Sequence, residues 1–343
     1  PDNTNPVYTY TPEDHDQLSA IFKAEMHSSK NTATYGNATS KIAVDKTGKK
    51  HVAYQDVGVI WYNYERAACG WGEDIAYSPW DLQYYSILGN TLDLNCGIKF
   101  SPVEHPLILH SLKFADVRLF CLTDIQTGQN LIEESSYSGN DFMPYFASQN
   151  YGTDNGRISC VWRTENNELK VKFFKPSYSS ISHIVPNADG ANNPSVQLVN
   201  SYYRKGAYGD DKGYVHFDIV YEKSEDIYNV HGKYAYPFGP TFDFDSPDNL
   251  TYKFSWILSS KHPYFIITPN EFDNIPLLAW EATVTDKIPA PPGFKGNSTL
   301  KAPPPQTYKS VQFMKDFYGF PVNFCFGFGG HRSPSLFFTQ DGR

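Results

Sequence analysis

Residues 41–66 read KIAVDKTGKKHVAYQDVGVIWYNYER and predict three short β-strands joined by tight turns. The runs KIAV, HVAY and VIWYNY are rich in β-branched and aromatic residues, and the segments between them are polar or contain Gly. Strand-like runs separated by turn residues are typical of an antiparallel meander. The middle run ends in Tyr54 and Gln55, an aromatic residue followed by a polar one, and related segments recur along the chain.

Five later segments resemble this middle run. They are LILH at 107–110, CVWR at 160–163, IVYE at 219–222, LAWE at 278–281 and CFGF at 325–328. If Tyr54, His110, Trp162, Tyr221, Trp280 and Phe326 are equivalent, the spacing between repeats is 46 to 59 residues. This is near the length of a four-stranded propeller blade. Six occurrences therefore predict an all-β fold, a six-bladed β-propeller, in which radial packing covers the apolar faces of the sheets. The alternative is a pair of β-sandwich or jelly-roll domains.

We expect a single domain over residues 1–343, with an N-terminal strand and one short helix in 1–36 and blades over roughly 37–343. The helix is predicted from Thr11 as a cap, followed by Pro12 and acidic residues in the first turn. Its apolar face continues to about Met26. The Pro/Gly-rich segment 288–306 is expected to be a long loop, because too few residues follow it to fold alone.

Composition excludes several classes of function. The net charge is −8 and only seven arginines are present, which argues against a nucleic-acid partner. No apolar run reaches the roughly 18 residues of a membrane span. Neither a Gly-x-Gly-x-x-Gly motif nor a Walker loop occurs, so we expect no nucleotide cofactor.

Cysteines and sequons bear on the cellular compartment. The five cysteines form no CxxC motif, and Cys121, Cys160 and Cys325 lie in apolar runs where buried thiols are expected. Three sequons, at Asn37, Asn249 and Asn297, permit glycosylation of a secreted protein. We expect an extracellular protein, with a cytoplasmic location and a homo-oligomer left open.

Aromatic residues next to polar ones suggest carbohydrate as the partner. A flat aromatic ring matches the C–H face of a pyranose, and planar Arg, Gln or Glu side chains match its hydroxyls. Neighbours in a strand point to opposite faces, so one site needs an aromatic from one blade and a polar group from the next. The predicted stacking platforms are Trp71, Trp162 and Trp280, the predicted hydroxyl partners are Arg163, Glu65 and Glu281, and Tyr221–Glu222 is a further pair. The alternative is that each aromatic packs between blades while its polar neighbour caps a loop.

Two other functions fit the same sequence. A glycoside hydrolase or lyase would use carboxylates around a central funnel, with Asp45, Asp56, Glu65, Glu222 and Glu281 as candidates. No sequence spacing pairs any two of these residues. A scaffold, or a carrier of a small hydrophobic ligand, would show one deep apolar cavity. We expect no cofactor, with a calcium ion left open at Asp243 and Asp245 in the acidic stretch FDFDSPDN.

Residues 51–71, HVAYQD…VIWYNYERAACGW, resemble the repeat of the six-bladed fungal fucose-binding lectins, the Aleuria lectin family. Those repeats combine a strand carrying aromatics and Gln, a strand carrying Glu, and a Gly-Trp pair. The resemblance implies a lectin without catalytic activity, in which Glu65 and Trp71 contact the sugar. The chain departs from the family in its arginines, because only Trp162–Arg163 offers one in a comparable strand. The resulting hypothesis is a non-catalytic glycan-binding propeller.

Overall fold

The protein is described from a computed structural model. The described residues are 41–56, 59–66, 70–72, 75–76, 91–101, 105–114, 117–136, 142–149, 157–174, 179–199, 214–235, 241–252, 254–267, 276–285, 307–315, 317 and 321–327. The predicted N-terminal strand and helix, and the predicted loop 288–306, lie outside these residues.

The described residues form five antiparallel sheets, which follow one another along the chain. The first sheet holds β1 (Ile42–Val44), β2 (Lys50–Asp56), β3 (Val59–Arg66), β4 (Gly70–Trp71) and β5 (Ile75–Ala76). The second holds β6 (Thr91–Phe100), β7 (Pro106–Phe114), β8 (Val117–Asp124) and β9 (Asn130–Ser136). The third holds β10 (Tyr145–Gln149), β11 (Arg157–Arg163), β12 (Leu169–Phe174) and β13 (Ser180–Ile184).

The fourth sheet holds β14 (Asn192–Val199), β15 (Tyr214–Lys223), β16 (Asp226–Ala235), β17 (Phe242–Phe244) and β18 (Asp248–Asn249). The fifth holds β19 (Ile257–Ile267), β20 (Pro276–Thr285), β21 (Thr307–Lys315) and β22 (Val322–Gly327). In each sheet four strands pair in chain order, and β5 and β18 are short additions to β3 and β16. The predicted meander at residues 41–66 is confirmed as β1, β2 and β3.

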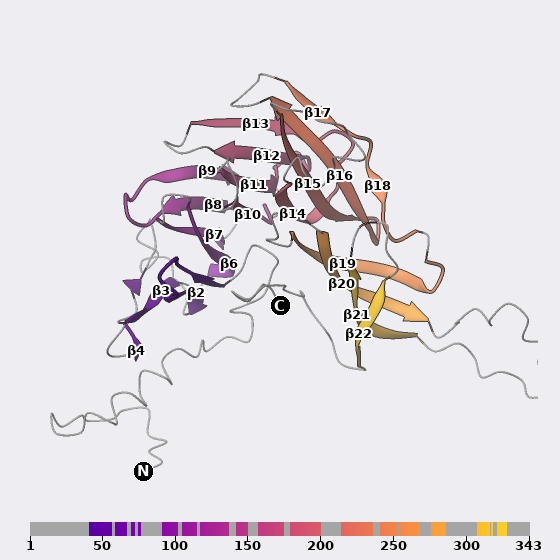
Figure 1. Ribbon diagram of the computed structural model, residues 1–343, viewed down its shortest axis with the longest axis horizontal. Helices are drawn as coiled ribbons and strands as arrows, with labels where there is room; N and C mark the ends of the chain where they lie inside the picture. The colour runs from indigo at the N-terminus through magenta and orange to yellow at the C-terminus, as the bar shows by residue number, and fades with distance from the viewer. Residues whose placement is uncertain are drawn as a thin grey trace, which may run out of the picture.

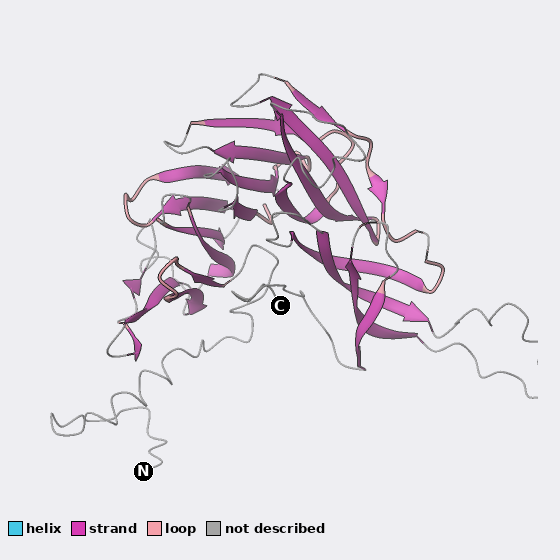
Figure 2. Ribbon diagram, viewed as in Figure 1, coloured by secondary structure: helices cyan, strands magenta, loops and turns pink. Residues whose placement is uncertain are grey.

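The five sheets are arranged in an arc, with β6, β10, β14 and β19 on its inner side (Figure 1). These are the first strands of the second to fifth sheets. The described part of the chain contains strands, turns and loops but no helix (Figure 2), so none of its residues forms a helix that could cross a membrane. Four-stranded meanders placed radially make the fold propeller-like.

Buried residues along the strands form apolar clusters between neighbouring sheets. In β12 buried and partly exposed residues alternate before the two final phenylalanines, as expected for a strand packed on one face more than the other. One apolar cluster joins the second and third sheets, including Phe120, Phe146 and Trp162. Another joins the fourth and fifth sheets, including Val220 and Trp280. Each sheet thus covers the apolar face of the next.

The repeated segments mark one strand of each described sheet. Tyr54, His110, Trp162, Tyr221 and Trp280 lie on β2, β7, β11, β15 and β20, each the second strand of its sheet. The assignment of CFGF as the corresponding strand of a sixth repeat is wrong. Residues 325–327 belong to β22, the fourth strand of the fifth sheet, because the segment pairs with β21. Five sheets are described, so the sixth blade stays a prediction.

Candidate functional site

Three residues with left-handed backbone conformation stand where the first strands of three sheets begin or bulge. Met143, Asn193 and His262 have φ of 44°, 46° and 51°, and each precedes a proline. The register of β14 with β15 shifts between Asn192 and Ser195, and that of β19 with β20 shifts between Lys261 and Tyr264. Positive φ is uncommon outside Gly, and such residues gather at functional sites. Two of these residues direct their backbone N–H groups away from their own sheets, that of Asn193 toward Met143 Sδ at 3.4 Å and that of His262 toward Glu222 of the fourth sheet.

The sequence analysis did not identify these left-handed residues, although each is followed by a proline that is visible in the sequence. Residues 143–146 read MPYF and residues 262–265 read HPYF, and the fourth sheet has the related NPSV at 193–196. The shared feature is any residue followed by Pro at the start of an apolar strand. These motifs precede or interrupt the first strands of their sheets, whereas the repeated segments that end in an aromatic and a polar residue lie on the second strands.

Glu222 receives two hydrogen bonds from these bulges. Its Oε2 accepts one from Asn193 Nδ2 at 3.0 Å and one from the backbone N–H of His262 at 3.1 Å. Asn193 belongs to the same sheet as Glu222, and His262 belongs to the next. The end of the second strand of the fourth sheet is thereby joined to the fifth sheet.

Glu281 occupies the corresponding position one sheet further on. Its Oε2 lies 3.7 Å from His262 Nδ1, and its Oε1 accepts a hydrogen bond from Lys309 Nζ at 3.1 Å. We call Asn193, Glu222, His262, Glu281 and Lys309 the rim array. The structure therefore brings two predicted site residues, Glu222 and Glu281, to one histidine that was not predicted.

Arg163, in the third sheet, is also held from the next sheet. Its Nη1 donates a hydrogen bond to Asn192 Oδ1, and its backbone N–H donates to the carbonyl of Phe142 at 2.7 Å. The side chain is buried. Arg163 and Glu222 thus share one pattern, in which a polar residue at or near the end of a second strand contacts the first strand of the following sheet.

The large aromatics of the same second strands lie in the core. Trp162 is 1% exposed and packs against Phe120, with ring centroids 5.4 Å apart. Trp280 and Tyr221 are both 0% exposed. A sugar needs an accessible ring face for stacking, and this burial does not support a stacking role for these three side chains. Their positions match the alternative in which the aromatics fill the space between sheets.

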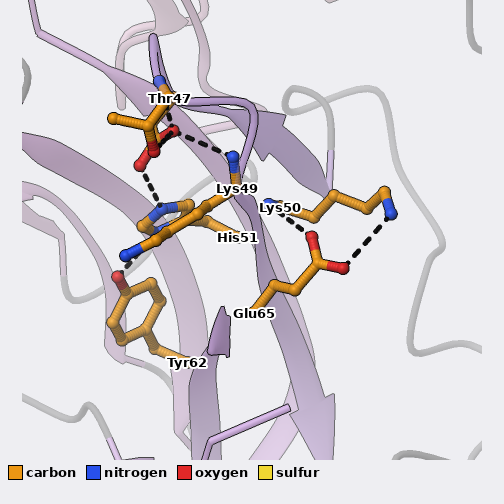
Figure 3. A network of polar contacts seen from close by, with 7 residues as sticks. Thr47, Lys49, Lys50, His51, Tyr62 and Glu65 are labelled. Atoms are coloured by element: carbon orange, nitrogen blue, oxygen red, sulfur yellow. Dashed lines mark hydrogen bonds and ion pairs between the residues drawn. The ribbon is translucent and has the colours of Figure 1, made fainter. Parts of the chain in front are cut away.

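Glu65 and Trp71 do lie together. They are cross-strand partners in register on β3 and β4, and both are partly exposed. The carboxylate of Glu65 accepts a hydrogen bond from the backbone N–H of Lys50 at 3.3 Å and lies 3.6 Å from its ammonium (Figure 3). Directly opposed residues on one face of an antiparallel pair have Cβ atoms about 4.5–5.5 Å apart. This pair is an accessible aromatic beside an anchored carboxylate.

A second network fixes the turn that leads into Lys50. Asp45 Oδ1 accepts hydrogen bonds from the backbone N–H groups of Thr47 and Lys49 at 2.8 and 2.9 Å. His51 lies between Asp45, 3.4 Å from Oδ2, and the hydroxyl of Tyr62 at 2.8 Å (Figure 3). Burial raises the pKa of Tyr62 to about 12, so its hydroxyl stays protonated and is no nucleophile at neutral pH. The network positions the strand that carries Lys50.

The other predicted residues lie apart from these sites. Asp243 and Asp245, predicted as calcium ligands, are exposed on and after β17. In the ranges that the structure describes, no three His, Cys, Asp or Glu side chains gather as a metal site would require. Among the predicted carboxylates, Asp56 ends β2. Cys121 and Cys160 are buried free thiols, as expected.

Comparisons with known proteins concern the fold. No protein-family model matches the chain, and no curated protein matches it. Among solved structures, the chain is similar to a triple arginine-to-alanine mutant of AofleA from Arthrobotrys oligospora. They share 9% identity over 91% of this chain and 78% of that one, with a TM-score of 0.47.

Two further solved structures are similar to the chain. For the structure described as the Dos1 propeller, identity is 10% over 72% of this chain and 56% of that one, with a TM-score of 0.39. An exo-β-1,3-galactanase from Clostridium thermocellum shares 9% identity over 82% of this chain and 62% of that one, with a TM-score of 0.37. At TM-scores below 0.5 these similarities assign neither a family nor an activity to the chain.

Proposed function

We propose that the protein binds carbohydrate without transforming it, and that Glu65 and Trp71 hold a sugar ring on the first sheet. The observation that carries this proposal is their register, which sets a partly exposed indole opposite a partly exposed carboxylate. The indole offers a flat face to the C–H groups of a pyranose, and the carboxylate accepts hydrogen bonds from its hydroxyls. Lys50, beside Glu65, adds a donor.

The proposal places the protein with the propeller lectins that the first sheet resembles. The Aleuria-type repeat supplies Glu and Gly-Trp to its sugar, and Glu65 and Trp71 are the matching residues here. An extracellular location belongs to the same proposal, because glycans of cell surfaces and secretions would be the targets.

A glycan-array screen of the purified protein tests the proposal. We expect binding to a defined group of glycans, a marked loss of signal for Trp71→Ala, and no loss for Tyr252→Ala. Tyr252 is a suitable control because it is an exposed aromatic outside the first sheet, 66% accessible. Chromatography of the bound glycan after prolonged incubation should return it unchanged. An array without signal, or equal signal for Trp71→Ala, would count against the proposal.

The rim array favours a second candidate, a glycoside hydrolase. Glu222 and Glu281 come from neighbouring sheets and both contact His262. Glycoside hydrolysis needs two carboxyl groups, one to protonate the leaving oxygen and one to attack or to activate water. This candidate predicts product formation from a glycoside that Glu281→Gln abolishes while Trp71→Ala only weakens substrate binding.

A further inference from the structure

Lys99 lies on β6, a first strand on the inner side of the arc (Figure 1). Its ammonium is 5.9 Å from the centroid of the Tyr145 ring on β10, the first strand of the next sheet. Among the residues that the structure describes, no ion pair joins Lys99 to a carboxylate, unlike Lys50, Lys170 and Lys309. Its ammonium therefore faces an aromatic ring and no described carboxylate.

The surroundings of Lys99 disfavour its charge. Burial lowers the pKa of the ammonium to about 8. A cation removed from water is stabilised when an anion comes within contact distance, and the same contact raises its pKa again. The residue as a whole nevertheless keeps partial exposure.

Polar groups of three first strands meet at Tyr145. Gln197 Nε2 donates hydrogen bonds to the Tyr145 hydroxyl at 2.8 Å and to the carbonyl of Phe265 at 2.9 Å. The Tyr145 hydroxyl donates to the same carbonyl at 3.4 Å. Tyr145 thus links the lysine on β6 to a glutamine on β14 and a carbonyl on β19. Gln197 is partly exposed and uses its nitrogen for both contacts, so its amide oxygen is oriented away from them.

We propose that the inner side of the arc binds an acidic sugar, with Lys99 pairing with the sugar's carboxylate and Gln197 accepting a hydrogen bond from a hydroxyl. A lysine without a described carboxylate partner selects for a negative charge, and an aromatic with an adjacent amide suits the rest of a pyranose. The inference rests on carbohydrate as the ligand class. It does not rest on the Glu65–Trp71 pair, which lies on another sheet.

Calorimetric titration with D-glucuronate, D-glucose and acetate tests the inference. We expect the wild-type protein to bind glucuronate at neutral pH, with glucose and acetate each at least about tenfold weaker, a difference of about 1.4 kcal/mol. Lys99→Met should lower the affinity for glucuronate about tenfold or more. Lys46→Met, which changes an exposed lysine in a turn, should leave that affinity unchanged. Equal affinity of Lys99→Met and wild type, or of glucose and glucuronate, would overturn the inference.

Two further measurements cover the cases in which Lys99→Met does not fold or glucuronate binds at the first sheet. If Lys99→Met does not fold, glucuronate should still protect Lys99 of the wild-type protein from an amine-reactive reagent, read by peptide mass spectrometry with Lys46 as the unprotected reference. Equal labelling with and without glucuronate would contradict the proposed site. Trp71→Ala should leave glucuronate binding unchanged. If Trp71→Ala abolishes it and Lys99→Met does not, the acidic sugar binds at the first sheet, and the inference fails while the proposed function stands.

Discussion

The backbone N–H of His262 donates a hydrogen bond to the carboxylate of Glu222 at 3.1 Å, and this contact joins the fourth sheet to the fifth. His262 holds a left-handed conformation, with φ of 51°, that costs free energy for a residue with a side chain. The contact with Glu222 and the approach of its ring to Glu281 offset that cost. The bulge is thus maintained by one contact between sheets and one within the fifth sheet.

Removing the carboxylate of Glu222 should therefore destabilise the fold. Glu222→Ala leaves the His262 N–H and the Asn193 amide without this acceptor, and we expect a loss of about 1–3 kcal/mol in the free energy of unfolding. Urea denaturation measures it. Glu133→Ala, an exposed glutamate whose hydrogen bond is with Asn130 of its own strand, should stay within about 0.5 kcal/mol of wild type. Equal effects of the two substitutions would contradict this role for Glu222.

Gly232 gives a test of packing within the fourth sheet. A Cβ at this position would overlap the ring of Phe217, its cross-strand neighbour. Gly232→Ala should cost about 1–3 kcal/mol, as overpacking does in a filled core. Phe217→Leu should relieve much of that cost, so the double variant is expected to be more stable than the sum of the two single losses predicts. Strictly additive losses in urea denaturation would show that the ring does not occupy this space.

The sequence predicted the sheets better than the site. The repeated segments locate the second strand of each described sheet because their aromatics fill the space between sheets, and that packing requires a regular pattern. The same burial removes Trp162 and Trp280 from solvent, a consequence that residue type alone does not reveal. Glu65 and Trp71 were found because they lie six residues apart across one turn. Glu222 and Glu281 meet through His262, and contacts between sheets leave no spacing signal along the chain.

His110 should make the protein sensitive to acid. It is fully buried on β7, and burial lowers its pKa from 6.5 to about 4. The unfolded chain takes up this proton near pH 6.5 and the folded chain only near pH 4, so stability is lost as the pH falls through this window. His110→Leu should lose less stability than wild type between pH 7 and pH 4, by up to about 3 kcal/mol. Urea denaturation at both pH values measures it.

The comparison for His110 needs a matched variant. Leu122→Ala, on the neighbouring strand β8, removes buried apolar volume but no titratable group, so it should lower stability at both pH values and leave the pH dependence of unfolding as in the wild type. If His110→Leu follows the wild-type curve between pH 7 and pH 4, His110 is not the group responsible.

The buried and accessible tryptophans should differ in their effect on folding. Trp280→Ala empties a position at the centre of the core between the fourth and fifth sheets, and we expect a loss of about 3–5 kcal/mol. Trp71→Ala should cost less than about 1 kcal/mol, because the side chain is partly exposed on a two-residue strand. Thermal unfolding compares the two. A loss for Trp71→Ala as large as that for Trp280→Ala would show that Trp71 belongs to the core.

The most direct test of glycan binding is a titration of the best array glycan into wild type, Trp71→Ala, Glu65→Gln and Tyr252→Ala. We expect Trp71→Ala and Glu65→Gln each to weaken binding about tenfold or more, since each removes one side of the Glu65–Trp71 pair, while all variants keep the wild-type fold. Tyr252→Ala should bind as wild type does. Unchanged affinity in both Trp71→Ala and Glu65→Gln would contradict the assignment of the sugar to the first sheet.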